Sequence, residues 1–250
     1  MRTSKNTILE QGIKGLLTLA APFQKFIDKP GYTHEFCNSQ ALIILANDGY
    51  AEYAAFYNKY LSELNKGVYW ADSDWKNINH YFNPATGKGL WHCTNAVETM
   101  QGYYHQALQL LYQHEIKKSI FFLGAALHLL QDLCEPHHAR GKLLSGHKGF
   151  EQWAQLNCAK FKINSGVLCN NTSSLAAFAI KNSKVGADFL SWVSNGEDQS
   201  KYEVVAKELL PLAQRSTAGL LISFAREVYC VRPKEISAAE TNVYQTLKVV

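Results

Sequence analysis

This 250-residue sequence lacks the cysteine spacing of a thiolate metal site. Its six cysteines include no C-x-x-C pair, which excludes a zinc knuckle and a thioredoxin-type redox motif. No apolar run approaches the roughly 20 residues that a helix needs to cross a bilayer. No tract rich in proline, glycine or serine divides the chain either. We therefore expect one domain with one sizeable hydrophobic core.

A block of like charge is also absent. The net charge is +4, and the lysines and arginines are scattered along the chain. This balance indicates neither nucleic acid nor an anionic membrane as a specific partner. A hydrophobic content of 47% with 18% charged residues is typical of a globular protein.

Strand-like alternation is almost absent, whereas apolar residues recur at helical spacing through most of the chain. We predict an all-α, multi-helix bundle in a single domain at residues 31–231, preceded by an N-terminal helix or pro-segment at 1–30 and followed by a tail at 232–250. The predicted helices span residues 7–20, 34–47, 50–65, 94–113, 116–133, 147–159, 174–193 and 199–228.

The N-terminal segment matches a secretory signal poorly. Glu10 and Lys14 interrupt the approach to a short apolar run at residues 15–21, and Pro22 follows that run directly. The segment matches the first amphipathic helix of the domain about equally well. The sequence therefore leaves both an exported and a cytoplasmic protein open.

Two residue pairs share one spacing. His128 and Asp132 stand four residues apart, and so do His147 and Glu151. In a helix, the members of each pair lie on one face, about one turn apart. His138 lies between the pairs, directly after a proline bend, and adds another imidazole. Zinc requires nitrogen and oxygen donors that converge at about 2.0 to 2.2 Å from one point, so these residues predict a metal site.

The surroundings of the first pair favour the same interpretation. Residues 119–133 are apolar nearly all round, which is typical of a helix in a protein core. An unpaired buried carboxylate costs several kcal/mol, so Asp132 must gain a partner or stay protonated. A single pair could also be a buried histidine that forms a hydrogen bond beside a capping aspartate. The second pair, just beyond the bend, favours the metal.

The predicted loop at residues 66–91 is unusually aromatic and contains Asp72, Asp74 and His80. Loops are normally polar, so this composition needs a reason. The aromatic side chains could pack over the end of the bundle, or they could line a substrate cleft. These two interpretations are compatible.

Four segments together resemble the zinc-dependent phospholipase C family of bacteria, the all-α phosphatidylcholine-hydrolysing enzymes related to clostridial alpha-toxin. They read N-K-G-V-Y-W-A-D at residues 65–72, H-Y-F-N-P at 80–84, H-L-L-Q-D-L-C-E-P-H-H at 128–138 and H-K-G-F-E at 147–151. The resemblance extends from about residue 32 to about residue 228. The conjunction of these segments is far more specific than any one of them.

The resemblance implies a cleft with a trinuclear zinc site, holding two to three zinc ions per chain. Asp72 matches the carboxylate that acts as general base or orients the attacking water. Four histidines match no ligand position and are expected to be structural or at the surface: His92, His105, His114 and His137. The implied ligands are His80, His128 and Asp132 for one ion; His138, His147 and Glu151 for a second; and His34 for a third, with Asp132 as the bridge.

This sequence departs from the family pattern in two places. In the family, the amino and carbonyl groups of an N-terminal tryptophan complete the third metal site, but no tryptophan precedes Trp70 here, and the corresponding window is residues 21–24. Ser73 also stands where the family usually has a tyrosine that contacts choline. Trp75 or Tyr81 could supply an aromatic face for a cationic head group instead.

The implied function is a phospholipase C that cleaves a glycerophospholipid, at a membrane surface or in a micelle, into diacylglycerol and a phosphorylated head group. Zinc suits this chemistry, because a phosphodiester is anionic and its leaving alkoxide needs stabilisation. The resemblance also implies export, and it does not imply a nucleic acid partner. The sequence does not indicate an oligomeric state.

Two other functions fit parts of the pattern. A zinc nuclease of the S1/P1 type resembles the same bundle and acts on single-stranded nucleic acid, but its later ligands are usually a histidine and an aspartate, so Glu151 favours the phospholipase. A non-catalytic helical protein braced by zinc is the third hypothesis. Asp72 and an open zinc position argue against it, because structural zinc sites are closed by four protein ligands.

Overall fold

The computed structural model describes residues 31–144, 146–169, 174–194 and 198–231. Within these ranges the chain is helical and has no strand, only an isolated bridge between Asn83 and Lys88. The predicted all-α class is therefore confirmed. Five predicted helices are found within a few residues of their expected bounds: α3 (Tyr32–Asn47), α6 (Ala96–Tyr112), α7 (Ile116–Asp132), α8 (His147–Asn157) and α11 (Gln199–Val231).

Two predicted helices are wrong in their continuity. The helix expected at 50–65 is two helices, α4 (Ala51–Lys59) and α5 (Leu61–Ala71), which meet at Tyr60 with a φ of −117°. The helix expected at 174–193 is likewise α9 (Leu175–Asp188) and α10 (Leu190–Val193). Neither break falls at a proline or a glycine, and the apolar pattern continues across both. The sequence therefore predicted one helix in each place. The predicted helix at 7–20, the whole segment 1–30 and the tail at 232–250 lie outside the described residues.

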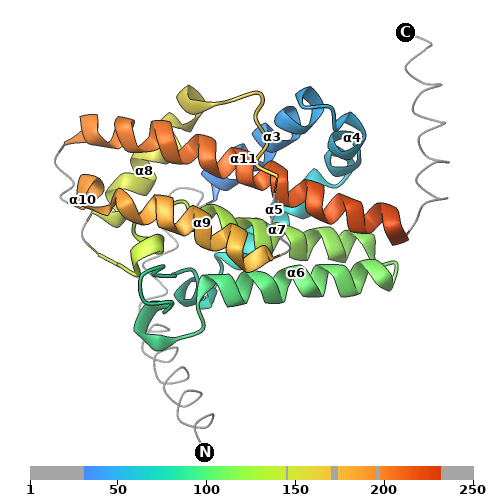
Figure 1. Ribbon diagram of the computed structural model, residues 1–250, viewed down its shortest axis with the longest axis horizontal. Helices are drawn as coiled ribbons and strands as arrows, with labels where there is room; N and C mark the ends of the chain where they lie inside the picture. Colours follow the sequence, from blue (N-terminus) through green and yellow to red (C-terminus); the bar gives the residue numbers. More distant parts are fainter. Residues whose placement is uncertain (1–30, 145, 170–173, 195–197, 232–250) are drawn as a thin grey trace, which may run out of the picture.

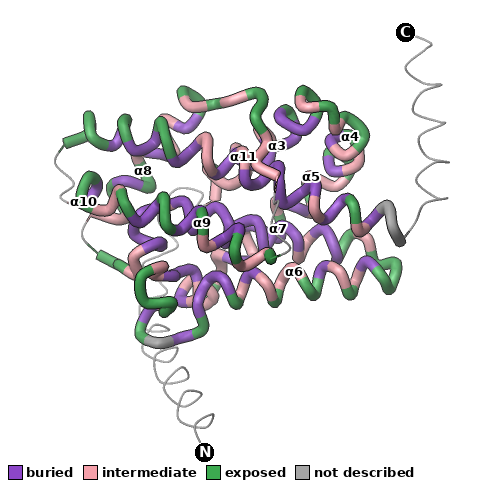
Figure 2. Tube along the Cα trace, viewed as in Figure 1, coloured by how far each residue is buried: buried purple, intermediate pink, exposed green. Residues whose placement is uncertain are grey.

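Helix α7 lies at the centre of the molecule. Figure 1 shows α6, α7 and α11 running along the length of the bundle, and Figure 2 marks buried residues along them. Every residue of α7 from Leu123 to Asp132 is buried, as the all-round apolar pattern predicted. No helix in the described ranges combines the length and the apolar character needed to span a bilayer.

Helices α5 and α7 touch through two glycines. A Cβ atom on Gly67 would lie 1.8 Å from the carbonyl oxygen of Phe121, and one on Gly124 would lie 2.0 Å from that of Leu64. No other residue type fits these positions without separating the helices. Gly124 lies one helical turn before His128 on α7. The crossing therefore fixes the distance between the end of α5 and the polar end of α7.

The segment between α5 and α6 folds around a small core of its own. It contains the 3₁₀ turns η1 (Lys76–Asn79) and η2 (Leu90–His92). The apolar side chains of this small core are Ile78, Tyr81, Leu90 and Cys93. Asn95 ends the segment and begins α6, where its side chain accepts a hydrogen bond from the backbone N–H of Glu98 at 3.0 Å.

Candidate metal centre

The predicted site residues come together at the C-terminal end of α7. We define the inner cluster as His34, His80, His128 and Asp132, with Asp72 at its edge, and the outer cluster as Glu135, His138, His147 and Glu151. Within each possible ligand set in these clusters, the nitrogen and oxygen atoms lie within 4.8 Å of one another: Glu135, His138, His147 and Glu151; His34, His128 and Asp132; Asp72, His80 and His128; and His80, Asp132 and His138.

Asp132 stands at the middle of the inner cluster. Its Oδ2 lies 2.8 Å from Nδ1 of His80 and 3.2 Å from Nε2 of His128, whereas its Oδ1 lies 3.4 Å from Nε2 of His34. The two carboxylate oxygens therefore face imidazoles from different elements. Only 6% of the Asp132 side chain is exposed, so its charge needs partners in the protein.

The ring of His80 presents a lone pair to this carboxylate. Its Nε2 lies 3.0 Å from the carbonyl oxygen of Ala71 and must donate to it, because a carbonyl only accepts. In the neutral ring, Nδ1 is then unprotonated. It accepts a hydrogen bond from Nε2 of His128 at 3.2 Å, but Oδ2 of Asp132 lies closer, at 2.8 Å. Two lone pairs at this distance repel each other unless a cation lies between them. Such second partners fix the tautomer of metal-binding histidines.

His34 is held in the same way through a chain of hydrogen bonds. The hydroxyl of Thr217 donates to the carbonyl of Ala213 and accepts from Nε2 of Gln131, which also donates to Asn38. Oε1 of Gln131 therefore faces Nδ1 of His34, at 2.8 Å, and accepts its proton. Nε2 of His34 then directs a lone pair toward Asp132. Burial also lowers the pKa of His34 to about 4, so the ring is neutral at pH 7.

Asp132 and His138 hold charge in spite of their burial. Burial opposes ionisation of Asp132, but the charges of His128 and His138 hold the pKa of its carboxyl well below the usual range. Burial also opposes a charge on His138, but Asp132 and Glu151 raise its pKa to about 10. In the absence of metal, the positive charge of protonated imidazoles thus balances the negative charge of the carboxylates. The cluster is electrostatically suited to a cation.

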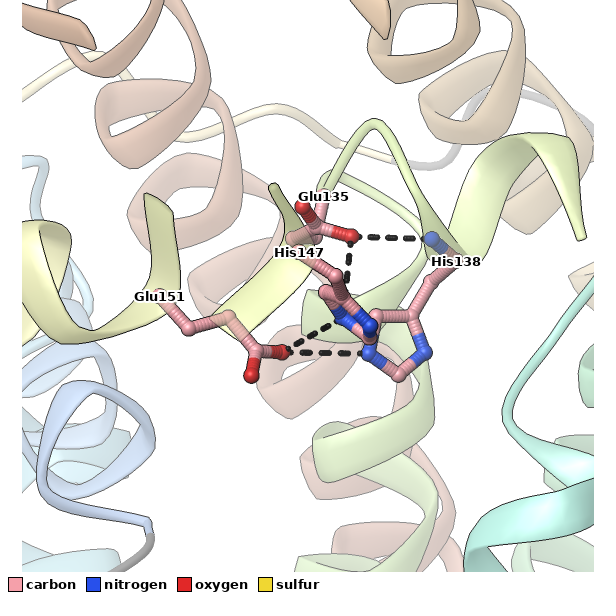
Figure 3. A group of neighbouring side chains, drawn as sticks. All are labelled: Glu135, His138, His147 and Glu151. Atoms are coloured by element: carbon pink, nitrogen blue, oxygen red, sulfur yellow. Dashed lines mark hydrogen bonds and ion pairs between the residues drawn. The ribbon is translucent and has the colours of Figure 1, made fainter. Parts of the chain in front are cut away.

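In the outer cluster, Glu151 lies beside two imidazoles. Its Oε1 lies 2.9 Å from Nε2 of His147 and 3.2 Å from Nε2 of His138 (Figure 3). His147 and Glu151 share one face of α8, as their spacing predicted. Nδ1 of His138 lies 3.2 Å from the carbonyl of His80, its hydrogen-bond acceptor, and this contact joins the two clusters.

The residues present fit zinc. Oδ2 of Asp132 and Nε2 of His147 are buried without a hydrogen bond of acceptable geometry, although other polar atoms lie within 3.2 Å of both. Close polar atoms with no hydrogen bond between them are compatible with donors to a shared cation. The donors are imidazole nitrogens and carboxylate oxygens, which are common zinc ligands.

Some of the predicted site residues are placed differently from expectation. Tyr81 is buried and one ring face stacks on His138 with centroids 4.6 Å apart, so the expectation that it offers a free face to a head group is wrong. His105 and His114 are exposed and His137 is fully buried, which agrees with the expectation that these histidines are structural or at the surface. The side chain of His92 lies outside the described part of the chain.

Sequence reasoning missed Glu135. It lies three residues after Asp132 and directly before the proline bend, and the structure places its carboxylate in the outer cluster (Figure 3). An acidic residue next to the P-H-H turn was the available signal. The direction of this side chain cannot be read from the sequence alone.

Comparison with known proteins identifies the family. The family model for zinc dependent phospholipase C matches residues 33–195, so the chain belongs to this family. The fold is that of the alpha toxin of Clostridium absonum, with a TM-score of 0.69 at 19% identity over 82% of this chain and 65% of that one.

Two phospholipases C illustrate the relationship in sequence. One from Bacillus cereus is 32% identical over 92 residues, which cover 34% of this chain and 32% of that protein. One from Clostridium perfringens is 24% identical over 242 residues, which cover 81% of this chain and 60% of that protein. The chain thus spans less than two thirds of the length of either relative. Membership of the family and the clusters above together support zinc as the metal.

Proposed function

We propose that this protein is a zinc-dependent phospholipase C, whose catalytic domain is residues 31–231. It would hydrolyse the phosphodiester of a glycerophospholipid on the glycerol side. A bond forms between water oxygen and phosphorus, and the bond from phosphorus to the glycerol oxygen breaks. The products are diacylglycerol, which takes up a proton on its new hydroxyl, and a phosphorylated head group.

One observation carries this proposal. Asp132 faces imidazoles with both of its carboxylate oxygens. A carboxylate oxygen of Asp72, which is not one of the proposed zinc ligands, lies within 4.8 Å of the ligand atoms of His80 and His128. A site that only braced the fold would have no use for a further, partly exposed carboxylate beside it. A hydrolytic site needs such a group next to its metal ligands.

The zinc ligands, Asp72 and His80 have different roles in the proposed hydrolysis. Zinc ions held by these ligands would neutralise the phosphate oxygens, lower the pKa of the attacking water and stabilise the leaving alkoxide. Asp72, at the C-terminal end of α5, accepts the proton of that water at a carboxylate oxygen. His80 is fixed between the carbonyl of Ala71 and Asp132, so the chain segment that follows Asp72 keeps its distance from α7.

We propose two to three zinc ions per chain. The first is bound by His80, His128 and Asp132, and the second by His138, His147 and Glu151. His34 with bridging Asp132 forms part of a third site. Residues 21–24, which the family pattern relates to completion of that site, lie outside the described residues. Determining the N-terminal residue of the protein from its native host tests both this completion and the proposed export.

The substrate is a phospholipid at a membrane surface or in a micelle. Trp75, half-buried near Asp72 in the chain, is the remaining aromatic candidate for contact with a cationic head group. Its replacement by leucine should raise KM for a phosphocholine ester more than for a head group without a cation.

Paired assays test the proposed activity. The purified protein should contain zinc, hydrolyse phosphatidylcholine in mixed micelles, and lose both activity and thermal stability when a chelator removes the metal. Single-stranded DNA serves as the parallel substrate. Hydrolysis of DNA alone would support the nuclease alternative, and a zinc-containing protein inactive on both substrates would support the zinc-braced alternative.

A further inference from the structure

Glu135 occupies a fourth position in the outer cluster. Figure 3 shows its carboxylate above the ring of His147, with Glu151 to the lower left and His138 to the right. One ligand atom of each of these four residues lies within 4.8 Å of all the others. The family pattern assigns only three of them to a metal.

The spacing of these atoms matches the edges of a coordination tetrahedron. Bonds of about 2.0 to 2.2 Å from zinc to nitrogen and oxygen place neighbouring ligand atoms about 3.3 to 3.6 Å apart. Nε2 of His147 lies 3.6 Å from Oε2 of Glu135 and 2.9 Å from Oε1 of Glu151. Nε2 of His138 lies 3.2 Å from Oε1 of Glu151. The distance to Glu135 thus fits as well as the distances to the expected ligand.

Local hydrogen bonds hold the Glu135 carboxylate in this position. Its Oε2 accepts from the backbone N–H of His138 at 2.8 Å, and its Oε1 lies 2.7 Å from Nδ1 of His137. The ring of His137 is fully buried and stacks on that of His147, with centroids 4.8 Å apart. Only 14% of the Glu135 side chain is exposed. A carboxylate oxygen has lone pairs for both an N–H and a metal, and such hydrogen bonds are usual around metal ligands.

We propose that Glu135 is a fourth protein ligand of the outer metal site, together with His138, His147 and Glu151. This inference rests on the proposed function only for the identity of the metal. Two carboxylates balance the charge of a zinc ion, and four protein ligands close its coordination sphere. The outer ion then ties the turn after α7 to α8. The position open to substrate lies in the inner cluster, beside Asp72.

The test is a zinc titration of the metal-free full-length protein against a chelating indicator, for Glu135→Gln beside the unmodified chain. The variant keeps the size of the side chain and an acceptor oxygen but loses the charge. We expect it to weaken one zinc equivalent by at least about 10- to 100-fold, the loss typical of a residue that only positions a ligand, and to leave the others unchanged. Asp188→Asn is the matched control, because Asp188 lies near the same turn, 3.9 Å from Arg140, but is 80% exposed and outside the cluster. It should change no equivalent.

Cobalt substitution separates a ligand from a positioning residue. If Glu135 binds the metal, Glu135→Gln should also change the visible absorption of the cobalt protein. Weaker binding with an unchanged spectrum, or unchanged binding, would overturn the proposal. If the variant does not fold, the crystal structure of the unmodified zinc-loaded chain decides. An Oε2 atom about 2.0 to 2.2 Å from the outer zinc supports the proposal, and a water molecule in that place refutes it. None of these measurements depends on phospholipase activity.

Discussion

The inner and outer clusters use the same donor types in different surroundings. In the inner cluster one carboxylate, Asp132, is shared among three imidazoles, and 6% of its side chain is exposed. In the outer cluster Glu135 and Glu151 serve two imidazoles, and 47% of the Glu151 side chain is exposed. A buried charge that loses its partners costs several kcal/mol, whereas an exposed one is solvated by water. Loss of an inner donor should therefore damage the fold, and loss of an outer donor should mainly weaken metal binding.

The largest effect is expected for Asp132→Asn. The variant loses the charge that offsets repulsion between neighbouring dications, so it should release zinc from the inner cluster. It should also lower the free energy of unfolding by about 3 to 5 kcal/mol, the usual cost of breaking a buried ion pair. Zinc analysis beside thermal melting measures both.

The control for this variant is Asp48→Asn. Oδ2 of Asp48 accepts from the backbone N–H groups of Gly166 and Val167, so its loss should destabilise a loop. Its zinc content should stay at the level of the unmodified protein. An Asp132→Asn protein with full metal content would contradict the shared bridge.

Asp72→Asn should separate catalysis from the scaffold. Asp72 is partly exposed at the end of α5, so zinc content and melting temperature should stay near those of the unmodified protein. Turnover of phosphatidylcholine should fall by roughly 10²- to 10⁴-fold, the range for loss of a general acid or base. Asp74→Asn is the control: Asp74 is 80% exposed, contacts Lys76, and should be dispensable. An active Asp72→Asn enzyme would remove this residue from the mechanism.

Glu151→Gln tests the outer cluster directly. We expect the binding of one zinc equivalent to weaken by at least roughly 10- to 100-fold, the loss typical of a residue next to a metal ligand. Glutamine keeps an oxygen donor but loses the negative charge. The melting temperature of the metal-free variant should change little, since half of this side chain is exposed. If metal-free Glu151→Gln were destabilised as much as metal-free Asp132→Asn, the contrast between the clusters would be wrong.

The smallest effect is expected for Gln131→Met, which removes the acceptor that orients His34. Zinc binding at the proposed third site should weaken by about 10-fold, and the nitrogen resonances of His34 should show a mixture of tautomers. Gln214→Met is the control, because Gln214 is also a buried glutamine but donates to the carbonyls of Phe161 and Leu210, away from both clusters. It should lower stability without changing metal binding. Unchanged tautomer populations in Gln131→Met would show that other contacts orient His34.

The features that rest on local geometry could be predicted from the amino-acid sequence. Helical periodicity defined α7 and α8, and a spacing of four residues placed His128 beside Asp132 and His147 beside Glu151. The conjunction of motifs then indicated the family, which implied His34, His80 and His138 as their partners. The two pairs lie together as predicted because neighbours on one helical turn are fixed by the backbone alone.

The tertiary structure decided everything that depends on contacts between distant segments. The break at Tyr60 and the glycine contact of α5 with α7 set where Asp72 lies, and no local signal marks the break. The hydrogen bond from His34 to Gln131 joins residues 97 positions apart. Glu135 lies beside His147 because α8 packs against the turn after α7. Local hydrogen bonds orient the Glu135 carboxylate, but the packing of α8 beside it is not encoded by spacing along the chain.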